Sequence, residues 1–224
     1  MNQAFKGCVV VQGPANREAI TEIKRCFDGY QLVFSCWVDD DSTIYEKDDI
    51  VVLNQKPEDS GPQNFYLQRK STIEGMKRAK ELGWTRALKW RSDMWCTDGD
   101  RLFRKFDSDS LNLYFWLALL DGYIADFFME GEIDDIITLF DTDIPKWKWN
   151  YPEFGITLQF FKNGLERKAR FMGKELDSEC DIFWLRTKGW FSKHKEDNWY
   201  RDSLPENWKD WIPMRRGQPI NLFE

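Results

Sequence analysis

The feature of this chain that most constrains its fold is an alternation of short apolar runs with helical patterns over the first 90 residues. The apolar runs, which have the length and composition of buried strands, lie at 8–12, 32–38, 50–53 and 87–90. Helical spacing follows over 16–27 and 64–82, with Asn16 as the expected N-cap and Gly83 as the expected C-terminal cap. This order predicts an α/β fold in which helices flank a mostly parallel central sheet.

The second half is less regular. We expect a helix over 111–120, a strand over 123–128, a helix over 133–140, a loop over 145–151, a helix over 153–161 and a Trp-rich charged tail from Asp181. A length of 224 residues with 42% hydrophobic residues is enough for one large core. We therefore predict a single domain over 1–224, with a ligand-binding half over 1–100 and a second half over 101–224 that includes a smaller lobe and carries the tail.

Charge and cysteine content exclude several classes of protein. Lys+Arg 32 against Asp+Glu 38 gives a net charge of −6, which argues against a nucleic-acid-binding surface. The five cysteines are scattered without C-x-x-C spacing, which argues against a disulfide framework or a zinc site. The sequence contains no apolar run long enough to cross a bilayer and no secretory signal pattern, so we expect no transmembrane segment and a cytoplasmic location.

Polar residues follow three of the predicted strands. In a parallel sheet the ligand lies beyond the carboxyl ends of the strands, so Gln12-Gly13-Pro14, Asp39-Asp40-Asp41 and Arg91-Ser92-Asp93 are expected along one edge. Asp93 either holds a divalent cation together with phosphate oxygens or caps a turn. Lys89 and Arg91 share one face of their strand, where a cation either meets a diphosphate or neutralises Asp93. The acids at 39–41 either meet a ribose hydroxyl or form a solvated turn.

Two helices carry further candidates. Asn64, Gln68, Ser71 and Gly75 form a polar stripe that either faces solvent or lines a cleft. Arg69 is either a phosphate ligand or ordinary surface charge. Asp134 and Asp135 fall in the first turn of a helix, where the macrodipole keeps them ionised; they either act as a general base for a substrate hydroxyl or simply stabilise the helix.

Two compositional features bear on the chemistry. The twelve tryptophans either stack on sugar rings or hold a small lobe or a subunit contact together. His194 is the only histidine, which argues against Ser-His-Asp or Cys-His catalysis, and neither a P-loop nor a G-x-G-x-x-G is present.

The order of these motifs resembles the WavE-type glycosyltransferases associated with lipopolysaccharide synthesis. The resemblance covers about residues 8–160 and rests on 9–14, 35–37, 64–75, 88–93 and 127–140 taken together. It implies a GT-A-like fold and the transfer of a hexose from a UDP- or GDP-sugar to a hydroxyl on a glycan acceptor, assisted by Mn²⁺ or Mg²⁺. Arg91 departs from the family pattern, because it stands where the first acid of Asp-x-Asp is expected; Leu67 departs as well, because an arginine is expected before Gln68.

The resemblance also implies roles for single residues. Asp93 would hold the metal, and Asp135 or Asp134 would be the base of an inverting reaction. The residues implied to surround the donor nucleotide and its phosphates are Gln12, Gly13, Pro14, Arg17, Asp39, Asp40, Gln68, Arg69, Thr72, Lys89 and Arg91.

Two other functions compete with transfer. A catalytically silent carbohydrate-binding protein of the same fold is favoured by the missing first acid of Asp-x-Asp. A different nucleotide-dependent enzyme is disfavoured by the lack of Gly-rich phosphate loops. The sequence leaves open the donor, the acceptor, the stereochemical outcome and whether the chain forms a homo-oligomer.

Overall fold

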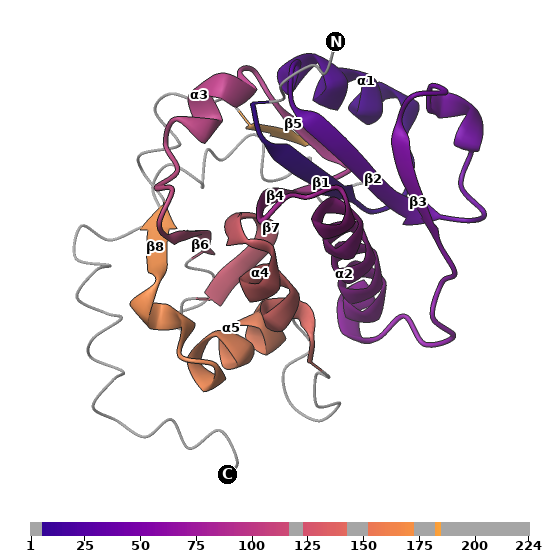
Figure 1. Ribbon diagram of the computed structural model, residues 1–224. Helices are drawn as coiled ribbons and strands as arrows, with labels where there is room; N and C mark the ends of the chain where they lie inside the picture. The colour runs from indigo at the N-terminus through magenta and orange to yellow at the C-terminus, as the bar shows by residue number, and fades with distance from the viewer. Residues whose placement is uncertain (1–5, 117–122, 143–151, 173–181, 185–224) are drawn as a thin grey trace.

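A seven-stranded sheet forms the centre of the molecule in the computed structural model, which describes residues 6–116, 123–142, 152–172 and 182–184 (Figure 1). Its strands are β1 (Cys8–Gln12), β2 (Gln31–Trp37), β3 (Ile50–Asn54), β4 (Arg86–Arg91), β6 (Leu111–Trp116), β7 (Tyr123–Glu132) and β8 (Ala169–Met172). They lie in the order β3-β2-β1-β4-β7-β6-β8. The first four are parallel, β7 is antiparallel to both β4 and β6, and β8 is parallel to β6. The predicted mostly parallel α/β sheet is confirmed.

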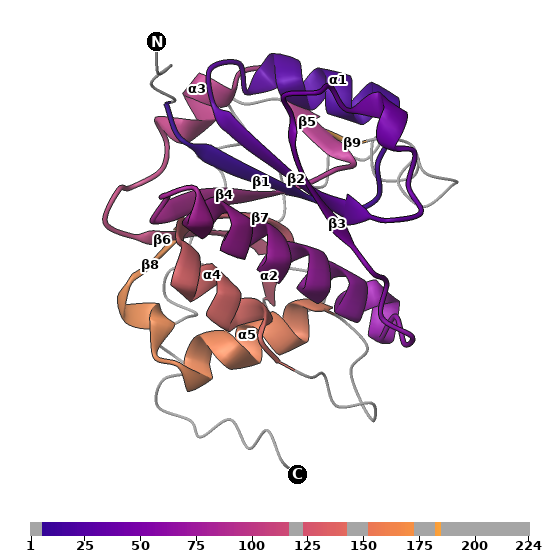
Figure 2. The ribbon, with the colours of Figure 1, turned by 45° about the vertical axis from the view of Figure 1, so that its right-hand side comes forward.

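Helices cover both faces of this sheet. The helices are α1 (Arg17–Cys26), α2 (Phe65–Glu81), α3 (Gly99–Phe103), α4 (Ile133–Phe140) and α5 (Pro152–Lys162), with short 3₁₀ turns at Ser42–Ile44, Pro62–Asn64 and Leu165–Arg167. In Figure 2, α1 and α3 lie on one side and α2, α4 and α5 on the other. Each side has its own hydrophobic core, one around Phe27 and Trp90 and the other around Val10, Met76 and Phe140. A separate two-stranded sheet pairs β5 (Met94–Cys96) with β9 (Ile182–Trp184).

The expected helix ends are confirmed. The side-chain Oδ1 of Asn16 accepts a hydrogen bond of 3.0 Å from the backbone N–H of Ala19, which satisfies one of the free donors at the start of α1. Gly83 follows α2 with φ +93°, a conformation that favours glycine, and its N–H donates to the carbonyl of Lys80.

The helix predicted over 111–120 is wrong for the part that the structure describes. Residues 111–116 form β6, which is paired on one side with β7 and on the other with β8. A short apolar run fits a buried strand as well as a buried helix, and here the aromatic residues Tyr114, Phe115 and Trp116 suit a strand between two neighbours. The predicted loop at 145–151 and most of the tail after Asp181 lie outside the described residues.

The polar stripe of α2 is a packing face. The hydroxyl of Ser71 donates to Oε1 of Gln12 at 2.9 Å, and both side chains are buried. A Cβ added to Gly75 would lie 2.5 Å from Cγ1 of Val10, so the glycine is what lets the helix approach β1 this closely. Of the stripe, Asn64 is exposed. The hydrogen bond from Ser71 to Gln12 fixes the first half of α2 beside the carboxyl end of β1.

Candidate functional site

The loops that follow β1 and β4 are joined at the carboxyl edge of the sheet. The backbone N–H of Ser92 donates to the carbonyl of Gln12 at 2.8 Å, and the Ser92 hydroxyl donates to the carbonyl of Pro14 at 2.8 Å. Gly13 has φ +122°, and a Cβ there would lie 2.6 Å from Oγ of Ser92. The predicted convergence of residues 12–14 with residues 91–93 is therefore present, and it depends on glycine at position 13.

The acids after β2 are held by the protein itself. Oδ2 of Asp40 accepts hydrogen bonds from the N–H groups of Ala15 at 2.9 Å and Trp37 at 3.1 Å, so this carboxylate ties the loop after β1 to the loop after β2. Asp39 forms an exposed ion pair of 2.6 Å with Lys56. Of the predicted residues here, Asp40 stabilises the edge and Asp39 lies at its surface.

Arg17 lies at the start of α1. Its Nη2 lies 3.3 Å from the hydroxyl of Thr43 and 3.8 Å from a carboxylate oxygen of Asp41, and its side chain is largely exposed. Asp41 caps the short turn at Ser42–Ile44 by accepting from the N–H of Thr43 at 2.9 Å. The structure thus brings Arg17 to the loop after β2.

Five ionisable side chains gather beyond the carboxyl end of β4, and we call them the edge cluster: Lys89, Arg91, Asp93, Asp126 and Glu153. Arg91 makes a two-pronged ion pair with Asp93, with Nε to Oδ1 at 2.9 Å and Nη2 to Oδ2 at 2.7 Å. The third guanidinium nitrogen, Nη1, lies 3.5 Å from Oδ2 of Asp126 on the neighbouring strand β7. The sequence left two roles open for a cation at this end of β4, contact with a diphosphate or neutralisation of Asp93. In the structure Arg91 neutralises Asp93.

Burial and neighbouring charges together shift the pKa values of both cations in the edge cluster. Lys89 is fully buried; its Nζ donates to the backbone carbonyl of Asp126 and lies 5.4 Å from the centre of the Phe140 ring. Loss of solvation lowers the pKa of Lys89 to about 8. Burial acts in the same direction on Arg91, but the charges of Asp93 and Asp126 outweigh it and the pKa of Arg91 is raised. Arg91 therefore stays charged at every pH at which the protein is folded.

The acids Asp126 and Glu153 were not among the sequence candidates. Asp126 is 1% exposed and Glu153 is 7% exposed. Within the part of the chain that the structure describes, Oδ1 of Asp126 and Oε2 of Glu153 have no hydrogen-bond partner. The sequence does contain a feature that marks each acid as a candidate. Asp126 interrupts an apolar strand, and Glu153 lies in the first turn of a helix, directly after a proline. What the sequence could not indicate is that these two positions meet.

The candidate residues on α2 divide into two groups. Oε1 of Gln68 and Oγ1 of Thr72, one turn apart, are buried and have no hydrogen-bond partner among the residues that the structure describes. Arg69 instead forms an ion pair of 2.9 Å with Asp141 at the end of α4. Gln68 and Thr72 therefore keep free hydrogen-bonding capacity, whereas part of the Arg69 guanidinium is already bound.

The described residues do not fit a divalent cation at Asp93. Both carboxylate oxygens of Asp93 accept from Arg91. Within residues 6–116, 123–142, 152–172 and 182–184, no three His, Cys, Asp or Glu side chains are close enough together to hold a metal ion. A cation at this position would have to displace the Arg91 guanidinium, whose pairing is favoured by two carboxylates, and we derive no step through such a cation.

Asp134 and Asp135 lie at the opposite edge of the sheet from Asp93. Because β7 is antiparallel to β4, its last residue, Glu132, pairs with Arg86 at the amino end of β4, and α4 begins there. The six residues of β4 separate this position from Arg91 by about 17 Å at 3.3 Å per residue. The structure does not bring these two acids together with the edge cluster.

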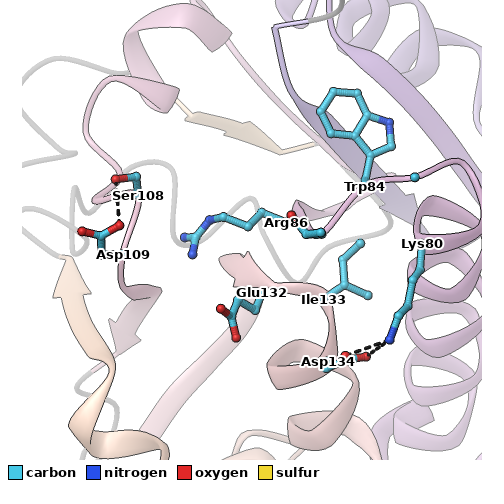
Figure 3. Close-up of a pocket in the computed structure, with 10 residues that line it drawn as sticks. Lys80, Trp84, Arg86, Ser108, Asp109, Glu132, Ile133 and Asp134 are labelled. Carbon is cyan, nitrogen blue, oxygen red and sulfur yellow. Dashed lines mark hydrogen bonds and ion pairs between the residues drawn. The ribbon is translucent and has the colours of Figure 1, made fainter.

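Both acids have partners at the amino edge. Asp134 forms a two-oxygen ion pair with Lys80 at 2.7 and 2.8 Å, and Asp135 lies 3.2 Å from Nζ of Lys168. Asp134 also lines an open cavity of about 600 Å³, whose walls come from the ends of α2 and β7 and from Ser108 and Asp109. Figure 3 shows Lys80 and Asp134 pointing toward one another at one side of this cavity.

The topology and the position of the edge cluster define a GT-A-like α/β fold. A solved structure with a similar fold is a protein from Desulfovibrio desulfuricans G20 that is described as a nucleotide-diphospho-sugar transferase, with a TM-score of 0.52, 9% identity, and coverage of 75% of this chain and 80% of that one. Another is a glycosyltransferase involved in the glycosylation of the major capsid of PBCV-1, with a TM-score of 0.48, 8% identity, and coverage of 74% and 81%. At these identities the first likeness establishes the fold, and the second adds no argument.

No family model matches the sequence, and no curated protein matches it either. Among the residues that the structure describes, none of the helices has the length and apolar character needed to span a membrane.

Proposed function

We propose that this protein is a glycosyltransferase that moves a sugar from a UDP- or GDP-sugar to a hydroxyl group of a glycan. The observation that carries the proposal is the edge cluster. On a fold like that of a nucleotide-diphospho-sugar transferase, the buried and incompletely paired charges lie beyond the carboxyl ends of the strands, where ligands bind in such sheets. In this proposal the nucleotide binds over residues 12–14 and the loop at 39–41.

Arg91 is the residue that we assign to the diphosphate. Its side chain is 19% exposed, and the planar donors of its guanidinium match phosphate oxygens as well as they match the carboxylate of Asp93. Departure of a nucleoside diphosphate needs positive charge beside the leaving oxygens, and a fixed arginine supplies this without a change of protonation. In this proposal the diphosphate competes with Asp93 for the guanidinium.

The finer parts of the hypothesis remain predictions. They are the WavE-type family, the hexosyl donor, the assistance of Mn²⁺ or Mg²⁺, the division into halves at residue 100, the cytoplasmic location and a homo-oligomeric state. Of these, the cation has the least support from the described residues, because Arg91 binds both oxygens of its predicted ligand Asp93.

Calorimetric titration with a panel of UDP- and GDP-sugars, with and without Mn²⁺, tests the proposal. We expect one nucleotide to bind and the variant Arg91→Lys, which keeps the charge but loses the planar fork, to bind it at least tenfold more weakly. Lys77→Met removes an exposed cation from the second half of α2, where it pairs with Glu74, and serves as the control, with affinity expected to stay within about twofold. Absence of nucleotide binding together with binding of free glycans would support the silent carbohydrate-binding alternative instead.

A further inference from the structure

Glu153 is held against β7 by the helix that carries it. Thr157 lies four residues later on the same face of α5, and its Oγ1 accepts a hydrogen bond of 3.0 Å from the N–H of Ile124 on β7. Asp126 follows Ile124 by two residues on that strand, and one turn of helix spans about the same length as two residues of strand. The charges of Asp126 on β7 and of Arg91 and Lys89 on β4 all act on the Glu153 carboxyl, which agrees with a position beside Asp126 and the end of β4.

The free oxygens at this position call for a ligand. A buried polar atom left without a hydrogen bond destabilises the folded state, so such atoms are uncommon in folded proteins. Two of them, Oδ1 of Asp126 and Oε2 of Glu153, belong to carboxyl groups of one cluster, next to the arginine that we assign to the diphosphate. A hydroxyl group that entered here would donate a hydrogen bond to one of these carboxylate oxygens and so supply the missing partner.

We propose that Glu153 is the general base of the transfer reaction. This inference rests on the proposed function. In the step, the acceptor O–H loses its proton to the Glu153 carboxylate while the acceptor oxygen forms a bond to the anomeric carbon. The bond from that carbon to the β-phosphate oxygen breaks, its electron pair leaves with the nucleoside diphosphate, and Arg91 faces the charge that develops. Attack opposite to the leaving group inverts the configuration of the sugar.

The charges around Glu153 give this base a distinctive pH dependence. Burial raises the pKa of Glu153 to about 8, and the charge of Asp126 on β7 adds to the shift, whereas Arg91 and Lys89 on β4 oppose it. At neutral pH most molecules hold the protonated form, which cannot accept a proton. The reaction rate should therefore rise as the pH passes through about 8, which is also the pH at which half of the Lys89 side chains have lost their charge.

Hydrolysis of the bound donor, with water as the acceptor, tests the inference without knowledge of the natural acceptor. For the nucleotide sugar that binds in calorimetry, Glu153→Gln is expected to lower kcat by about 10²–10⁴-fold and to leave the dissociation constant within about threefold. The rising limb of the pH profile should disappear in this variant, and the sugar released by the wild type should have inverted configuration. Glu132→Gln, a matched change at the amino edge, should leave kcat and the pH profile unaltered.

Each outcome has a separate meaning. Failure of every donor to bind the wild type overturns the proposed function and, with it, this inference. Donor binding without hydrolysis at any pH, hydrolysis with retained configuration, or a wild-type profile without the rising limb overturns the role of Glu153 and leaves donor binding intact. The same holds if Asp135→Asn abolishes hydrolysis while Glu153→Gln does not. The pH profile and the product configuration are measured on the wild type, so they can overturn the role of Glu153 even if Glu153→Gln does not fold.

Discussion

Replacing Glu153 with glutamine is expected to remove a pH dependence from the stability of the protein. In the folded state burial raises the pKa of this carboxyl from 4.5 to about 8, with a further contribution from Asp126. Between these two pH values the folded protein keeps a proton that the unfolded chain releases. The stabilisation is fully present below pH 4.5 and is lost as the pH rises through about 8. Glutamine resembles the protonated acid at every pH and should not show this loss.

The size of the effect follows from the width of the pH window. One proton contributes about 1.4 kcal/mol per pH unit, so the whole window corresponds to at most about 5 kcal/mol. Lys89 acts in the opposite direction above pH 8, because its pKa is lowered from 10.5 to about 8 and its contribution to stability rises over that range. Measurements should therefore stop at about pH 8.

Urea titrations of the wild type, Glu153→Gln and the control Glu132→Gln, taken from about pH 5 to 8, give the free energies of unfolding. We expect the glutamine variant to gain several kcal/mol over the wild type as the pH rises, and the control to follow the wild type. Parallel curves for all three proteins would refute the reasoning, because a buried carboxyl whose pKa is raised to about 8 could not behave in that way.

Two further changes test the packing that supports the site. Gly75→Ala should lower the free energy of unfolding by about 1–3 kcal/mol, because the added Cβ meets Val10 at 2.5 Å, and Val10→Ala in the same chain should restore part of the loss in urea titrations. Arg86→Ala should cost about 3–5 kcal/mol in the same assay, because among the described residues it leaves the buried carboxylate of Glu130 with only the amide of Asn112 at 2.6 Å; a change below 1 kcal/mol would contradict the importance of this pair.

Local chemistry made the first half of the fold predictable. Asn16 and Gly83 mark helix ends through their own hydrogen bonding and backbone conformation, and continuous apolar runs mark the buried parallel strands. The meeting of residues 12–14 with 91–93 followed from one rule, that parallel strands end at a common edge. These features depend on sequence neighbours or on strand direction alone.

The second half depends on pairings that no local pattern records. The antiparallel direction of β7 carries the start of α4 to the amino edge. Asp134 and Asp135 therefore lie away from Asp93, although all three acids were candidates for one site. The same reversal brings Asp126 to the carboxyl edge, where α5 adds Glu153. Similarly, the apolar run at 111–116 became a strand because β7 and β8 were present to pair with it.

Hydrogen–deuterium exchange with and without the nucleotide sugar that binds in calorimetry tests the location of the site most directly. We expect slower exchange in the segments 13–16 and 91–95 when the donor is present, and no change in 80–86 or 132–134, which contain residues that line the amino-edge cavity. Protection confined to 80–86 and 132–134, with the segments 13–16 and 91–95 exchanging as before, would contradict this location of the site.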